Sequence, residues 1–141
     1  MPRDAVSITI PGKPIAKGRP RMGRNGRVYT PERTRGAEES LQWALREGCP
    51  VPLEGPLEME VTFSFRYPKS WPKAKREAVE EGTHPWYNRR PDLDNLLKLL
   101  TDAGNGVLWK DDTQVVAVDA TKEYSIEDST FVVVRVLGGT P

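Results

Sequence analysis

The sequence predicts one small α+β domain with a mixed β-sheet and two main helices. Three observations support this prediction. The length of 141 residues suits a single domain with one modest core. Strand-like alternation and helix-like periodicity occur in the order strand, helix, strand, helix, strand, strand. Apolar residues make up 37% of the chain and charged residues 29%, which is typical of a soluble globular protein.

The first half of the chain is expected to hold a strand, a loop and a helix. Residues 6–10 alternate apolar and polar side chains, as a half-buried strand does. Residues 11–30 are rich in Gly, Pro and Arg and are expected to form a flexible basic loop. The first main helix is expected at residues 31–47, with Thr30 as its N-cap and Gly48 at its end.

The clearest strand signal lies at residues 57–67, where apolar and polar side chains alternate strictly. A short charged helix at 72–81, the second main helix at 93–105 and two closing strands at 114–123 and 130–137 are expected to follow. The pairing of these strands does not follow from the sequence.

The composition limits the class of protein. Cys49 is the only cysteine, so an intrachain disulfide and a Cys-based zinc site are excluded. No apolar stretch approaches the roughly 20 residues that a membrane span needs, and no secretory signal is visible. We therefore expect a protein of the reducing cytoplasm, without a membrane partner.

Charge is distributed unevenly along the chain. Residues 1–37 hold nine Lys or Arg against two Asp or Glu, whereas residues 38–141 hold twelve against eighteen. A basic segment beside a more acidic body suggests a polyanionic partner, and phosphate contacts give affinity without sequence preference. The alternative is a solvated mobile loop. The candidate DNA contacts are Lys13, Lys17, Arg19, Arg21, Arg24 and Arg27, with Arg33 and Arg35 beyond them.

Acidic residues mark the start of the second main helix. Pro91 disfavours helix before it, so Asp92 is a good N-cap candidate, which would explain one carboxylate without catalysis. Asp94, Lys98 and Asp102 follow at i, i+4 and i+8 and share one helix face. That row is either a solvated salt-bridge stripe or part of a site.

A second acidic pair, Asp111 and Asp112, precedes a predicted strand. The connection from the helix is short and contains Gly104 and Gly106, so a quick turn of the chain would bring Asp112 toward the acids at 92 and 94. Three carboxylates around one point repel each other unless a cation lies between them, and carboxylate oxygens suit Mg²⁺. A bound metal can polarise a phosphodiester and activate water.

The chain resembles the RusA family of Holliday junction resolvases at these acidic segments. The matching residues are 91–98 (Pro-Asp-Leu-Asp-Asn-Leu-Leu-Lys), Asp102-Ala103, Asn105-Gly106 and 111–115 (Asp-Asp-Thr-Gln-Val). Residues 12–21 and 29–31 are similar to the N-terminal pattern of the phage-type members of the family.

The resemblance implies a role for each matching residue. Asp92 and Asp94 match the paired metal-binding aspartates, Lys98 the catalytic lysine and Asp112 the third essential aspartate. Asp111 and Asp102 are additional candidates, of which Asp102 is as well explained by a structural role. The resemblance also implies a RusA-like fold, a homodimer, dependence on Mg²⁺ (for which Mn²⁺ can substitute), and paired cuts in four-way DNA inside a bacterial host or phage-infected cell.

Aromatic residues and one histidine surround these segments in the sequence. An exposed ring among Trp71, Trp86, Tyr87 and Trp109 could stack on a base, although core packing is the simpler expectation for each. His84 is either a general base or an ordinary loop residue. The alternatives to a junction-resolving endonuclease are a nuclease for flaps and other branched DNA, and a DNA-binding recombination protein without catalysis.

Overall fold

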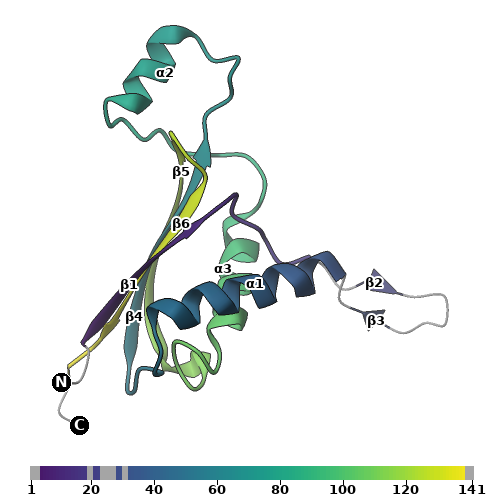
Figure 1. Ribbon diagram of the computed structural model, residues 1–141, viewed down its shortest axis with the longest axis vertical. Helices are drawn as coiled ribbons and strands as arrows, with labels where there is room; N and C mark the ends of the chain where they lie inside the picture. Colours follow the sequence, from purple (N-terminus) through teal and green to yellow (C-terminus); the bar gives the residue numbers. More distant parts are fainter. Residues whose placement is uncertain (1–3, 19–20, 23–27, 30–31, 139–141) are drawn as a thin grey trace.

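The computed structural model describes residues 4–18, 21–22, 28–29 and 32–138 (Figure 1). Its main sheet contains four strands in the order β1 (Ala5–Pro11), β6 (Ser129–Val136), β4 (Leu57–Arg66) and β5 (Val115–Ser125). β6 pairs antiparallel with both β1 and β4, whereas β4 and β5 are parallel. The sheet is therefore mixed, as the sequence predicts.

Three helices accompany the sheet: α1 (Glu32–Gly48), α2 (Lys73–Glu80) and α3 (Leu93–Gly104), and a 3-10 turn, η1 (Asp112–Gln114), precedes β5. These bounds agree with the predicted helices to within one or two residues. The predicted basic loop contains a short ladder between β2 (Arg21–Met22) and β3 (Val28–Tyr29), which the sequence did not indicate. The expected cap, Thr30 with Pro31, lies outside the described residues.

Both main helices cover one face of the sheet (Figure 1). The apolar members of the alternating β4 pattern point to this face, and α1 packs against α3 and β1. Burial of this apolar face is the main force that joins helices and sheet. The core holds, among others, Ile8, Leu45, Val61, Phe63, Leu96, Leu100 and Val132. None of the helices in the described part of the chain has the length and apolar character that a membrane crossing requires.

Two glycines allow the helices to approach their neighbours closely. A Cβ atom on Gly48 would lie 2.5 Å from Ile8 Cγ1, and one on Gly104 would lie 2.7 Å from Trp109 Cζ2. Trp109 is completely buried, and its Nε1 donates to Asn105 Oδ1 at 2.8 Å. The indole therefore fixes the turn that follows α3 and directs the chain toward η1.

The segment between β4 and α3 forms an excursion, residues 68–90, that projects beyond the end of the sheet and carries α2 (Figure 1). It returns to β5 through two backbone hydrogen bonds, from Tyr87 N to Lys122 O at 3.0 Å and from Tyr124 N to Pro85 O at 2.8 Å. This α2 excursion thus begins and ends beside the last residues of β5.

Candidate active site

Asp92 and Asp94 stand exposed at the start of α3. Asp92 occupies the N-cap position, as predicted, but its side chain makes no capping hydrogen bond. Asp94 Oδ1 accepts the backbone N–H of Asn95 at 2.9 Å. Helix capping therefore does not account for the Asp92 carboxylate, and the positive end of the α3 dipole favours negative charge at both positions.

The turn before Asp92 is held in place by β5. Lys122 Nζ donates to Arg89 O at 2.7 Å and to Pro91 O at 2.9 Å, and the Tyr87 hydroxyl donates to Arg90 O at 2.8 Å. An open hollow of about 560 Å³ lies here, lined by Arg90, Pro91, Asp92 and Asn95. No sequence motif indicates Lys122 as part of the site, because its contacts are to backbone carbonyl groups.

Asp102 binds two lysines. Its Oδ1 lies 3.2 Å from Lys98 Nζ, and its Oδ2 contacts Lys17 Nζ. Partial burial raises the pKa of Asp102, but hydrogen bonds and charge from Lys17 and Lys98 outweigh it, so that the pKa lies below its ordinary value. Lys98 points to Asp102 in this structure. These two members of the helix-face row Asp94, Lys98 and Asp102 therefore form a salt bridge.

Asp111 and Asp112 have different environments. Asp111 caps η1: its Oδ1 accepts the Thr113 N–H at 3.0 Å, and Gln114 Oε1 accepts the Asp111 N–H at 3.2 Å. The Thr113 N–H is the main reason why the pKa of Asp111 lies below its ordinary value. Asp111 therefore has a structural role, whereas no capping bond engages the half-buried Asp112.

Asp112 lies at the opposite end of α3 from Asp92. Asp92 precedes the helix, η1 follows it, and 12 helical residues span about 18 Å. Among the described residues, no group of three or more His, Cys, Asp or Glu side chains is placed to hold a metal ion. Within one chain the structure thus brings Asp92 and Asp94 together at one helix end but does not bring Asp112 to them.

The aromatic residues divide into core and surface. Trp109 belongs to the core, and Trp71 and Tyr87 are half-buried in a ring cluster with Tyr124. The side chain of Trp86 is largely exposed, and its backbone forms an isolated antiparallel β-bridge with Glu123. His84 Nδ1 lies 3.9 Å from Glu123 Oε1, in the α2 excursion and away from Asp112.

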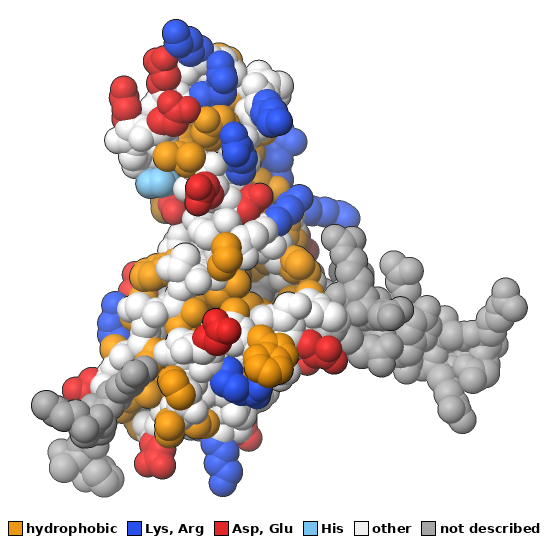
Figure 2. Space-filling model, viewed as in Figure 1, with side chains coloured by type: hydrophobic (Ala, Val, Ile, Leu, Met, Phe, Trp, Pro, Cys, Tyr) orange, Lys and Arg blue, Asp and Glu red, His pale blue; other side chains and the backbone are white. Residues whose placement is uncertain are grey.

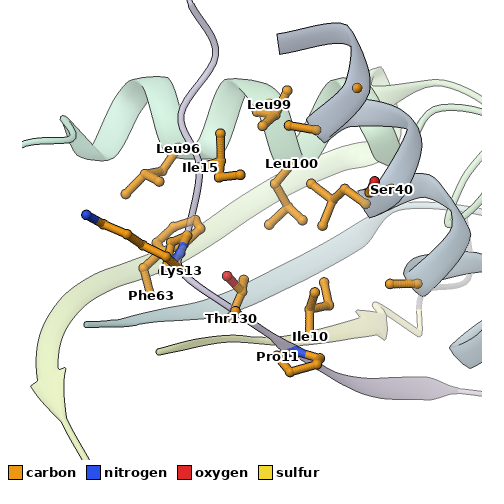
Figure 3. Close-up of a pocket in the computed structure, with 16 residues that line it drawn as sticks. Ile10, Pro11, Lys13, Ile15, Ser40, Phe63, Leu96, Leu99, Leu100 and Thr130 are labelled. Carbon is orange, nitrogen blue, oxygen red and sulfur yellow. The ribbon is translucent and has the colours of Figure 1, made fainter. Parts of the chain in front are cut away.

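An apolar pocket of about 540 Å³ lies between the segment after β1, α1 and α3 (Figure 3). Ile10, Ile15 and Leu100 point into it, and no acidic side chain lines it. This apolar pocket therefore offers no carboxylate for hydrolysis, whereas the hollow at Asp92 does.

The basic segment is described in part. Lys13 is exposed, whereas Lys17 is bound to α3 through its ammonium on Asp102 and through its backbone N–H, which donates to Asn95 O at 3.0 Å. Arg19, Arg24 and Arg27 lie outside the described residues, as does the side chain of Arg21. DNA contact by these residues stays a prediction.

Two comparisons with known proteins identify the family of the chain. Residues 11–136 match the family model described as endodeoxyribonuclease RusA. The chain is also 34% identical over 139 residues to the "Uncharacterized protein YqaN" of Bacillus subtilis (strain 168), an alignment that covers 94% of this chain and 96% of that protein. The acidic start of α3 and the downstream Asp-Asp pair lie within the matched range, and the chain belongs to the RusA endodeoxyribonuclease family.

Proposed function

We propose that this protein is a Mg²⁺-dependent endonuclease that resolves four-way DNA junctions by paired cuts. The observation that carries the proposal is the exposed Asp92–Asp94 pair at the start of α3, where Asp92 has no capping role and faces an open hollow. Membership of a family of endodeoxyribonucleases supports the reaction type.

The donor chemistry at this helix end suits the metal. Mg²⁺ is commonly held by one or two carboxylates together with waters and substrate phosphates. Asp92 and Asp94 supply two exposed carboxylates, and no ion pair joins either to a cation in the described part of the chain. When bound there, Mg²⁺ (or Mn²⁺) would polarise the scissile phosphate and make water more acidic.

The chain's own residues would position the DNA. Asp92 and Asp94 would hold the metal, and Lys122 fixes the carbonyl groups of the turn that carries Asp92. Lys98 lies one helical turn after Asp94 and would offset negative charge that develops on the phosphate. Its ammonium would have to rotate away from Asp102, a surface contact of low energetic cost.

A homodimer would complete the site with Asp112 of the partner subunit. β4 pairs with the inner edge of β5, and residues 85–87 cover only the end of its outer edge. Among the described residues, no segment pairs with the outer edge along Val115–Thr121. Val116 and Val118 on this edge are 62% and 47% exposed. A long apolar edge strand of this kind is a template for pairing with another chain.

If this free edge paired with itself in a two-fold antiparallel arrangement centred on Val118, Val115 of the partner subunit would lie opposite Thr121. The partner's η1 would then lie beside Lys122, which is hydrogen-bonded to Pro91 O. Asp112 of the partner subunit would thereby approach Asp92 and Asp94. Such pairing would explain how Asp112, the third aspartate of the family pattern, could act with Asp92 and Asp94 although it lies far from them within one chain.

The test is cleavage of end-labelled DNA by the purified protein with Mg²⁺, with Mn²⁺ and with EDTA. The substrates are a four-way junction, a flap and a matched duplex. We expect metal-dependent paired cuts in the junction and no cuts in the duplex. Asp92→Asn is the inactive control, and Glu127→Gln, an exposed acid in the β5–β6 turn, the active one.

Other outcomes would replace the proposal. Equal cleavage of the flap and the junction would favour a nuclease for branched DNA in general. Junction binding without cleavage under any metal condition would favour a recombination protein that only binds DNA.

A further inference from the structure

A second hollow, between the α2 excursion and the ends of β4 and β5, is basic. It has a volume of about 640 Å³, and its lining includes Lys13, Arg66, Lys69 and Arg89 against one acid, Asp128. Asp128 Oδ1 accepts the backbone N–H of Arg66 at 2.8 Å. In the described part of the chain, no ion pair joins any of the four cations to a carboxylate.

Figure 2 shows the same asymmetry on the molecular surface. On the lobe that Figure 1 identifies as the α2 excursion, acidic side chains gather on the left flank and basic side chains on the right. On the right, basic side chains continue down to the junction of this lobe with the sheet, where acidic side chains also lie.

The floor of the hollow is a packed cluster of rings. Phe65 stacks on Tyr87 at 3.9 Å between centroids, and Tyr124 meets Tyr87 at 4.9 Å and Trp71 at 4.5 Å. Trp71 also stacks with Tyr67 at 6.1 Å between centroids, and Lys75 Nζ lies 3.8 Å from the centroid of its ring. Because the rings pack against one another and against Lys75, they support the cations instead of offering free faces for bases.

The backbone that carries the cations is fixed at both ends of the excursion. Tyr67 N donates to Ser125 O at 3.1 Å next to Arg66, and Tyr87 N donates to Lys122 O at 3.0 Å shortly before Arg89. The Tyr67 hydroxyl donates to Glu80 Oε1 at 2.8 Å and so ties α2 to the same base. The positive charges therefore stand on a preformed frame.

The basic hollow lies close to the candidate active site. Arg89 precedes Asp92 by three residues, which span at most about 10 Å. A duplex strand carries one phosphate per roughly 3.4 Å of its axis. A strand whose scissile phosphate sits at Asp92 would thus reach the hollow within about three nucleotides.

We propose that this basic hollow binds the phosphate backbone of the duplex arm that leads to the scissile bond. The inference rests on the proposed function for the identity of the DNA, but the charge and shape of the hollow stand independently of catalysis. Contact through phosphates implies affinity without sequence preference and with strong dependence on salt.

The test compares two double variants of equal charge. Lys69→Ala with Arg89→Ala removes two cations of the hollow, whereas Lys73→Ala with Arg46→Ala removes two exposed cations outside it. Binding of a fluorescent junction, a matched duplex and a single-stranded oligonucleotide is measured by anisotropy over a salt series without divalent metal, and thermal melting checks the fold.

We expect the hollow variant to bind the junction and duplex more weakly, with a logarithmic salt slope reduced by about 1.8, because each lost phosphate contact reduces it by about 0.9. The control variant should keep the wild-type slope. Equal slopes in the two variants would overturn the proposal, and so would a loss confined to the single strand. A wild-type protein that binds but never cleaves would count against the proposed function and not against this hollow.

Discussion

Lys98 Nζ lies 3.2 Å from Asp102 Oδ1, and the other oxygen of this carboxylate contacts Lys17. Asp102 is the more buried partner, with 16% of its side chain exposed against 59% for Lys98. The lysine that matches the catalytic lysine of the family pattern therefore lies one turn beyond Asp94, in contact with a partly buried carboxylate. It can leave that contact, because its own side chain is mostly in solvent.

Lys98→Ala should lower the single-turnover cleavage rate of a preformed junction complex by roughly 10²–10³ while affinity changes little, because the charge acts chiefly in the transition state. Lys73→Ala is a matched control, since Lys73 also forms an exposed i, i+4 pair, with Glu77 at 3.8 Å. A normal rate with a small change in melting temperature would leave Lys98 only its surface pair with Asp102.

Asp102→Asn should change the dependence of stability on pH. The folded protein lowers the pKa of Asp102 below its ordinary value of 3.8, so the ionised carboxylate stabilises the fold above that pH. The contribution is lost as the pH falls from 3.8 through the lower folded value. We expect the variant to melt below wild type near neutral pH and the gap to shrink in acid; a gap independent of pH, or one equal to that of Glu127→Gln, would contradict this account.

The sequence predicted the helix and strand order well, because the strict alternation of β4 and the helix-like periodicity of the main helices are strong local signals. The sequence did not predict features that depend on contacts between residues distant in the chain. The short connection after α3 suggested that Asp112 returns to Asp92, but an unbroken helix separates them, and Trp109 on Gly104 fixes the turn at the far end. The supporting role of Lys122 and the basic hollow likewise arise from tertiary contacts that no spacing encodes.

Asp92→Asn and Asp94→Asn should each abolish cleavage and leave junction binding unchanged or tighter, because each removes a metal ligand and a negative charge near the DNA phosphate. Asp111→Asn offers a contrast: Asn caps a helix about as well as Asp, so stability should change little and cleavage should be largely retained. Gel-shift binding and single-turnover cleavage distinguish the two classes. Near-normal turnover of Asp92→Asn in Mg²⁺ would remove Asp92 from the site.

If the proposed dimer forms through the β5 edges, Val118→Asp should shift it to monomer, since the change would place two carboxylates at the centre of the paired edges. Ile126→Asp is the control, because Ile126 has a similar exposure of 44% but lies in the β5–β6 turn. Light scattering after size exclusion measures the mass. A Val118→Asp protein that stays dimeric would show that another surface joins the subunits.

The most direct test of the account mixes two inactive proteins, Asp92→Asn and Asp112→Asn, and lets their subunits exchange. If each site takes Asp92 and Asp94 from one chain and Asp112 from the other, every mixed dimer holds one intact site. The mixture should then nick the junction with about a quarter of the wild-type sites active, given random pairing of subunits. A mixture that stays inactive, although exchange has been verified and the wild type cleaves, would contradict the shared site.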